Sequence, residues 1–287
     1  MKNYLSLIKF SHTVFALPFA MIGFFLAVYL AKDGQFTSDI LLKLGLVILC
    51  MIFARSAAMA FNRYVDRDID AKNPRTITRE IPAGVIKPQS ALFFIILNVL
   101  LFIGTTYFIN PLCFFLSPIA LIVVLGYSYT KRFTALCHLV LGLGLALAPI
   151  GAYIAVTAEF ALIPVLYSVV VLLWVAGFDI IYSLQDESFD KSLQLHSIPT
   201  WLGKKNALHF SKILHFTTAV VVLAAAYLGG FGWLHWVAVC IFISLLIYQH
   251  LLVKPNDLSK VNLAFFTTNG IASMVFGILV ILDLIFF

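Results

Sequence analysis

Two short acidic segments contain the residues of this chain that are best suited to chemistry. The first is NRYVDRDID at residues 62–70, with three aspartates directly after a long apolar run. The second is DIIYSLQDESFD at residues 179–190, with four acids at the end of another apolar run. Carboxylate and amide oxygens are hard ligands of the kind that Mg²⁺ prefers. The seven histidines and four cysteines are scattered, so no pattern indicates zinc.

Helical spacing selects among these acids. If the preceding helix continues through each segment, a rotation of about 100° per residue aligns two sets on single faces. These sets are Asn62, Asp66 and Asp70 in the first segment, and Asp179, Asp186 and Asp190 in the second. Asp68 and Glu187 lie off the faces and are expected to be solvated. Aligned carboxylates repel one another, so either nearby Lys and Arg side chains or a divalent cation must offset them.

A Mg²⁺ ion held by one or two carboxylates takes its other ligands from water and substrate phosphate. Two acidic clusters facing one cavity would therefore clamp a diphosphate between metal ions. Basic residues near the segments are expected to bind the outer phosphate oxygens; they are Arg63, Arg75, Arg79, Lys87, Lys131 and Arg132. The helices beyond are rich in Phe, Leu and Val, so the cavity would suit a substrate with a diphosphate head and a hydrocarbon tail.

The elements that position these residues are membrane helices. Hydrophobic residues make up 62% of the 287-residue chain and charged residues 11%, far from the balance of a soluble domain. We expect an all-α polytopic membrane protein, with nine transmembrane helices around a central cavity that opens near the cytoplasmic side. The apolar segments cover residues 13–32, 40–61, 89–109, 112–130, 134–157, 161–183, 207–228, 232–252 and 262–286.

The distribution of positive charge predicts the orientation. Lysines and arginines gather at the N-terminus and in the loops after the second, fourth, sixth and eighth segments. The positive-inside rule then places the N-terminus and both acidic segments in the cytoplasm, in what we expect to be a bacterial inner membrane. These cytoplasmic lysines and arginines account for the net charge of +6, so the charge does not indicate that the protein binds nucleic acid. The chain is treated as one domain, 1–287, and four helices separate the acidic segments, which suggests an internal duplication.

Three further residues inside the apolar runs are candidates for the site. Arg55 precedes Asn62 by seven residues on the same helical face. A charge inside a membrane helix is costly and usually faces a functional cavity, although Arg55 could also extend to the cytoplasmic edge. We expect Arg55 to pair with the carboxylate of a substrate or with the acidic cluster. Tyr127 and Tyr182 are weaker candidates for contacting substrate.

These motifs resemble those of the UbiA superfamily of intramembrane aromatic prenyltransferases. Asn62-x3-Asp66-x3-Asp70 and Asp186-x3-Asp190 are similar to the two aspartate-rich motifs of that family. The segments YSYTKRFT (127–134), DIIYS (179–183) and NPRTITREIPAG (73–84) are also similar, and the resemblance extends over essentially the whole chain.

The resemblance implies a reaction in which a polyprenyl diphosphate binds through Mg²⁺ and its allylic carbon is attacked by an aromatic ring. It implies that Asn62, Asp66, Asp186 and Asp190 are ligands of the metal. It further implies that Asp70 and Asp179 complete or orient the sites. Asp66, Asp186 and Arg55 would be the most important for turnover, and Arg63, Lys131 and Arg132 would contact the diphosphate or an aromatic acid.

The acceptor is left open between two classes of aromatic acid. The first is 4-hydroxybenzoate, as in quinone biosynthesis. However, Arg63 follows Asn62 where that branch usually has Asp, and QLHSIP (194–199) stands where a Gly-x-Lys-Ser-Thr run is common. These features resemble the branch linked to menaquinone made by the futalosine route, whose acceptor would be a naphthoate-type acid.

Other classes of membrane protein fit less well. A secondary transporter would place its ionisable residues near the bilayer midplane on broken helices, whereas these acids lie at helix ends. A phosphotransferase acting on CDP-alcohols would carry an Asp-Gly-x2-Ala-Arg core, which this chain lacks. A purely structural membrane protein would not need two acidic faces. Nothing in the sequence indicates an obligate protein partner.

Overall fold

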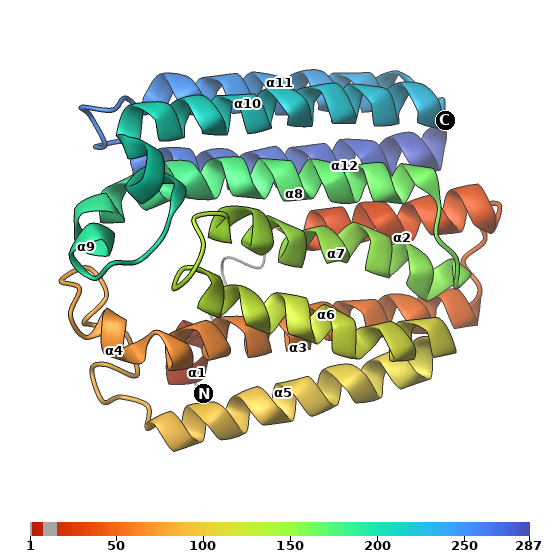
Figure 1. Cartoon of the computed structure of the whole chain (residues 1–287). Coiled ribbons are helices and arrows are strands. Elements are labelled where there is room, and N and C mark those ends of the chain that lie inside the picture. Colours follow the sequence, from red (N-terminus) through yellow and green to blue (C-terminus); the bar gives the residue numbers. More distant parts are fainter. Residues whose placement is uncertain (1, 8–15) are drawn as a thin grey trace.

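Long helices dominate residues 2–7 and 16–287, which are the residues that this computed structural model describes (Figure 1). Eight helical stretches in this part of the chain are long and apolar enough to cross a membrane. They contain α3 (Ser38–Val65), α5 (Pro88–Ile109), α6 (Pro111–Thr130), α7 (Cys137–Thr157), α8 (Leu162–Ser183), α10 (Ile198–Gly229), α11 (Trp233–Leu252), and α12 (Asn269–Phe286) with its preceding π-helical turn η3 (Leu263–Thr268).

The first predicted segment contains α2 (Leu17–Ala31), an apolar helix of 15 residues. Its predicted start, at residues 13–15, lies outside the described residues. Each of the nine predicted segments thus falls on a helix of the described chain, and the prediction of an all-α polytopic membrane protein is confirmed. The protein is an integral membrane protein.

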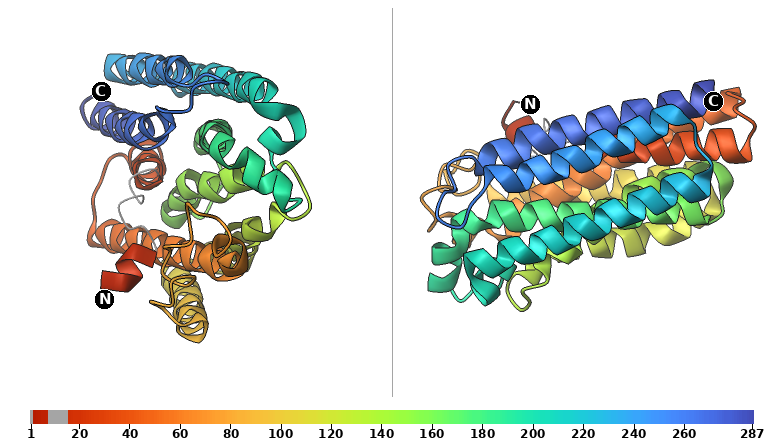
Figure 2. Two further views of the ribbon diagram at one scale, coloured as in Figure 1. Left: turned by 90° about the vertical axis from the view of Figure 1, so that its left-hand side faces the viewer. Right: turned by 90° about the horizontal axis from the view of Figure 1, so that it is seen from above.

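The helices form a ring when viewed along their axes (Figure 2, left). Helix α7 packs against α2, α6 and α8, while α3 packs against α5, and α8 packs against α10. An aromatic cluster fills the space between α2, α8, α11 and α12. In it, the ring centroid of Trp174 lies 5.3 Å from that of Phe19 and 5.6 Å from that of Phe242, which lies 5.0 Å from that of Phe276. This packed half supports the helices that carry the site.

Local sequence signals explain where several helices begin and end. Asn110 caps α6 by accepting a hydrogen bond from Cys113 N at 2.8 Å. Ser197 and Thr200 form a capping box at the start of α10. Ala158 ends α7 with a positive φ of 56°, and α8 begins four residues later at Leu162, so the two helices form a tight hairpin. Helix α10 begins nine residues before its predicted segment and is kinked at Gly203.

Both acidic segments interrupt their helices at the same end of the molecule. Helix α3 ends at Val65, and after Asp66 the short helix α4 (Arg67–Asp70) begins. Helix α8 continues into a 3-10 turn, η2 (Leu184–Asp186), and then into α9 (Glu187–Ser192). Figure 1 shows α4 and α9 at the left-hand end, opposite the C-terminus. The short helix α1 (Lys2–Leu7) lies against α3 at that end.

Candidate active site

One cavity of about 660 Å³ connects the two acidic segments. It is lined mainly by α3, α6, α7 and α8, with the loop between α4 and α5 and the segment after α8 at its polar end. All six predicted metal ligands line it, namely Asn62, Asp66, Asp70, Asp179, Asp186 and Asp190. The sequence placed these residues on two separate helices, and the tertiary structure brings them to one space.

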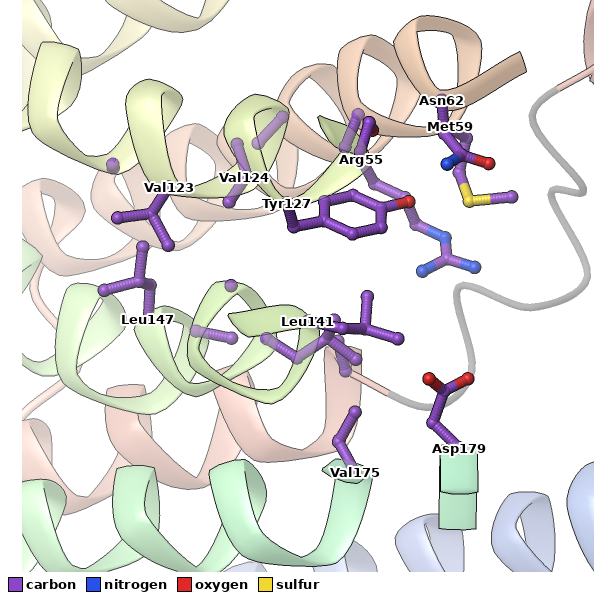
Figure 3. Close-up of a pocket in the computed structure, with 18 of the residues that line it drawn as sticks. Arg55, Met59, Asn62, Val123, Val124, Tyr127, Leu141, Leu147, Val175 and Asp179 are labelled. Atoms are coloured by element: carbon purple, nitrogen blue, oxygen red, sulfur yellow. The ribbon is translucent and has the colours of Figure 1, made fainter. Parts of the chain in front are cut away.

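The rest of the cavity is apolar and follows the helices through the membrane. On α7 the lining residues extend from Cys137 to Ala155. At a rise of about 1.5 Å per residue, this distance is roughly 27 Å, close to the thickness of the hydrocarbon core of a bilayer. Val123, Val124 and Leu147 belong to this apolar wall (Figure 3). The cavity therefore has the shape expected for a polar head and a long hydrocarbon tail.

The first motif is held together by hydrogen bonds and ion pairs. Asn62 Nδ2 donates to Asp66 Oδ2 at 3.2 Å, as expected for residues four apart on a helix. Arg132 Nη2 donates to Asp66 Oδ1 at 3.0 Å and also to the Val65 carbonyl at 2.9 Å, where α3 ends. Arg79 Nη1 lies 2.8 Å from each carboxylate oxygen of Asp70.

The second motif pairs with residues from other loops. Arg75, from the loop between α4 and α5, donates to the Asp186 carboxylate through Nε at 3.1 Å and to the Tyr182 hydroxyl at 2.8 Å. Lys131 Nζ lies 2.7 Å from Oδ1 of Asp190, whose side chain is fully buried. Burial by itself lowers the pKa of the Arg75 guanidinium, but Asp186 and Tyr182 together outweigh this effect and raise that pKa. Arg75 thus connects the loop of the first motif to the second motif.

Arg55 and Tyr127 occupy the cavity beyond the first motif. In Figure 3 the Arg55 guanidinium extends into the cavity next to the Tyr127 ring and faces the Asp179 carboxylate. Arg55 Nε is buried and has no hydrogen-bond partner among the described residues. A buried guanidinium nitrogen without a hydrogen-bond partner carries a desolvation cost, which a bound anion would offset. Arg55 therefore faces both of the partners expected for it, the acidic cluster through Asp179 and the space in which a substrate carboxylate would bind.

Two of the predicted substrate-binding residues do not line the cavity. The Arg63 side chain is buried and bonds to Glu80 at 3.4 Å, and Glu80 in turn accepts from Ser6 of α1. Lys87 is the exposed N-cap residue of α5. Arg63 points away from the face of α3 that borders the cavity, and Lys87 lies eight residues after Arg79, the last cavity-lining residue of the loop. Of the predicted group, Arg75, Arg79, Lys131, Arg132, Tyr127 and Tyr182 do line it.

The two acids that helical spacing set aside are also outside the cavity lining. The Asp68 side chain is 82% exposed and lies near Arg67. Glu187 pairs with Lys191, one turn further along α9, at 2.7 Å. The helical-face argument therefore separated the cavity-lining acids from the other two, but only Asp68 is solvated as predicted, because the Glu187 side chain is 13% exposed and pairs with lysines on α9 and α10.

His138 is a cavity residue that the sequence analysis did not select. It lies in the first turn of α7, and its Nδ1 is 2.7 Å from Asp179 Oδ2. No motif marks it, because a lone histidine at the start of an apolar segment is usually a packing residue. Its position just after the basic loop at 131–132 is the one available signal.

The chemistry of the cavity-lining oxygens fits Mg²⁺. Within the described residues, no three His, Cys, Asp or Glu side chains are already close enough to hold a metal ion, because most of the acids are paired with Lys or Arg. However, burial raises the pKa of Asp66 to about 6, although Arg132 partly opposes this. The carboxylate is therefore not fully compensated by protein groups. The site thus combines carboxylate and amide oxygens with negative charge that the protein does not neutralise. Such a site suits a hard divalent cation.

Comparisons with known proteins agree with this fold. Residues 16–271 match the UbiA prenyltransferase family. A 4-hydroxybenzoate octaprenyltransferase from Saccharophagus degradans is 31% identical over 257 residues, which cover 88% of this chain and 84% of the relative. The corresponding enzyme from Tolumonas auensis is 27% identical over 257 residues, covering 88% and 86%.

Solved structures show the same architecture. The apo structure of a UbiA homolog from Aeropyrum pernix K1 superposes with a TM-score of 0.85 at 31% identity, over 95% of this chain and 98% of that one. A UbiA homolog from Archaeoglobus fulgidus, bound to GPP and Mg²⁺, has a similar fold, with a TM-score of 0.73 at 22% identity over 98% and 99% of the two chains.

This chain belongs to the UbiA prenyltransferase family. It is a polyprenyltransferase embedded in the membrane, as the motifs predicted, and the alternative of a secondary transporter is set aside.

Proposed function

We propose that this enzyme transfers a polyprenyl group from its diphosphate to the ring of an aromatic acid such as 4-hydroxybenzoate, in a Mg²⁺-dependent reaction of quinone biosynthesis. The observation that supports this most is one cavity, which is lined at one end by the six aspartate and asparagine residues of the two motifs and has an apolar wall of about 27 Å beyond them. The relatives that are named for 4-hydroxybenzoate support the choice of acceptor.

The proposed roles follow from the contacts at the polar end. Asn62, Asp66, Asp186 and Asp190 would hold Mg²⁺, with Asp70 beside them. When bound, the metal would supply positive charge to the departing diphosphate. The four cations that now pair with the acids would then turn to phosphate oxygens; they are Arg75, Arg79, Lys131 and Arg132. Such an exchange keeps these four cations paired both before and after substrate binds.

The remainder of the cavity would orient the two reactants. Arg55 would bind the carboxylate of the aromatic acid, which places the ring beside Tyr127. The apolar helices would bind the polyprenyl tail and keep water away from the developing allylic cation. The polar end would face the cytoplasm of a bacterium, because the basic loops gather there.

A naphthoate-type acid is the second candidate acceptor. Arg63 follows Asn62 directly, and His196 lies in the segment after the second motif, where its amide donates to the Lys131 carbonyl at 2.8 Å. His196 contacts the loop that contains Lys131, while Arg63 on α3 bonds to Glu80, and neither residue lines the cavity. They therefore bear on the acceptor and leave the proposed reaction type unchanged.

The test is an assay of the purified protein in detergent with Mg²⁺, a polyprenyl diphosphate and a panel of benzoate and naphthoate acids. We expect a prenylated 4-hydroxybenzoate product, and we expect EDTA to abolish its formation and excess Mg²⁺ to restore it. Preference for a naphthoate would select the second acceptor. Absence of product with every aromatic acid would overturn the proposed function.

A further inference from the structure

Both ring nitrogens of His138 are engaged inside the protein. The side chain is buried, Nδ1 lies 2.7 Å from Asp179 Oδ2, and the backbone N–H of Ile198 donates to Nε2 at 3.4 Å. A backbone N–H can only donate, so Nε2 must accept and the Nδ1 proton points to Asp179. Three elements meet at this ring, because it belongs to α7, Asp179 to α8, and Ile198 to the first turn of α10.

Asp179 differs from the other acids of the cavity. Asp66, Asp70, Asp186 and Asp190 are each paired with a lysine or arginine. Asp179 is paired with a histidine, which is its sole side-chain hydrogen-bond partner among the described residues. Asp179 also precedes Asp186 by seven residues, so it lies about 10 Å further along the helix, away from the diphosphate end.

One oxygen of Asp179 is consequently available to the cavity. His138 bonds to Oδ2, while the side chain lines the cavity and is 23% exposed. Across the cavity stand Arg55 and Tyr127 (Figure 3). An aromatic acid whose carboxylate meets Arg55 would present its opposite edge toward α8. A hydroxyl group on that edge is a donor, and a carboxylate oxygen in a site of low polarity is a strong acceptor for it.

We propose that His138 is a positioning residue, which holds the Asp179 carboxylate so that its other oxygen accepts a hydrogen bond from the hydroxyl group of the aromatic acceptor. This inference rests on the proposed function. It assigns Asp179 to the acceptor rather than to the metal, and it assigns His138 a role that depends on the Nδ1 proton.

Substitutions of His138 distinguish this role from packing. In His138→Asn the amide nitrogen lies near the place of Nδ1 and can still donate to Asp179, whereas in His138→Gln the amide extends toward the place of Nε2. For His138→Ala and His138→Gln we expect kcat/KM for the aromatic acid to fall about 10- to 100-fold, as for loss of a hydrogen bond to a charged group. We expect His138→Asn to stay within about threefold of the wild type, and the KM for polyprenyl diphosphate to change less than about twofold in all three.

A double-mutant cycle tests the link to Asp179. If His138 acts through Asp179, adding His138→Ala to Asp179→Asn should reduce kcat/KM for the aromatic acid by less than about a further twofold. The affinity of the donor-free protein for the aromatic acid, measured by calorimetry, should follow the same pattern without any turnover. His209→Ala is the matched control, because His209 is exposed on α10 and lies outside the cavity lining.

Equal losses in His138→Asn and His138→Ala, additive effects in the cycle, or parallel rises in both KM values would overturn the inference. Thermal unfolding in detergent shows whether His138→Ala folds. If it does not fold, the comparison of His138→Asn with His138→Gln still tests the role of the Nδ1 proton. A wild-type enzyme that prenylates no aromatic acid would instead contradict the proposed function. If the wild-type enzyme prenylates an aromatic acid but the His138 variants show no defect specific to that acid, only the role of His138 is contradicted.

Discussion

At the scale of residues, the cavity contains acids that look alike in sequence but differ in surroundings. Asp66 and Asp68 are two residues apart, yet Asp66 lines the cavity and pairs with Arg132, whereas Asp68 is solvated. The difference follows from helical direction, since residues two apart point to nearly opposite sides.

Asp66 and Asp68 together provide a direct test of the metal site. We expect Asp66→Asn to reduce kcat by at least about 100-fold and to weaken Mg²⁺ binding, because an oxygen ligand with negative charge is lost. Asp68→Asn should keep wild-type activity within about twofold, since its side chain is exposed. Steady-state kinetics at several Mg²⁺ concentrations provide the measurement. Full turnover by Asp66→Asn would contradict its role as a ligand.

Arg55 supplies a second prediction at this scale. Its side chain lines the cavity, and its buried Nε has no hydrogen-bond partner among the described residues. We expect Arg55→Gln to raise the KM for the aromatic acid about 10- to 100-fold, because a charge-assisted hydrogen bond is lost. The KM for the diphosphate should change little. If the two KM values rise together, Arg55 serves the diphosphate or the acidic cluster instead.

At the scale of elements, the site depends on how closely α7 approaches α8. Gly142 of α7 faces the backbone of α8, and a Cβ there would lie 2.3 Å from the Leu172 carbonyl oxygen. Backbones can approach so closely because glycine has no side chain. His138 lies four residues before Gly142 on α7. The close contact at Gly142 therefore sets the distance between His138 and Asp179 on α8.

The close approach predicts an effect on stability. We expect Gly142→Ala to destabilise the protein by about 1–3 kcal/mol, because overpacking forces the two helices apart. Gly104→Ala is the control, since nothing lies within 4 Å of a Cβ at that position on α5. Thermal unfolding in detergent should show a lower midpoint for Gly142→Ala and an unchanged or higher one for Gly104→Ala. Equal midpoints would show that the helices can separate without cost.

At the scale of the whole molecule, the cavity extends from the acidic segments toward the opposite side of the membrane. Helices α3, α6, α7 and α8 line it, so its length is set by helices that the bilayer itself makes long. The polar end alone would bind a diphosphate of any chain length. The apolar part is therefore where donors of different length would be distinguished.

Blocking this apolar part should change the choice of donor. Gly151 lines the cavity about 20 Å along α7 from His138, and nothing lies within 4 Å of a Cβ there. We expect Gly151→Phe to reduce kcat/KM for a long polyprenyl diphosphate by about tenfold or more, because the ring occupies space that the tail needs. Turnover of geranyl diphosphate should be retained. The same change at Gly104, outside the cavity lining, should affect neither donor.

The sequence by itself determined the membrane helices and the faces of the acidic segments. Both depend on local periodicity, since about 20 apolar residues are needed to cross a bilayer and residues four apart share a helical face. For this reason the six residues of the two helical faces all line the cavity, whereas Asp68 and Glu187 do not.

Only the tertiary structure decided which distant residues meet. Arg75 contacts Asp186 across 111 residues of chain, His138 contacts Asp179 across 41, and Arg63 faces Glu80 instead of the cavity. Partners of this kind depend on the packing of whole helices and on the paths of loops, which local periodicity does not encode. Helical spacing therefore predicted the acids of the site, while helix packing selected their partners.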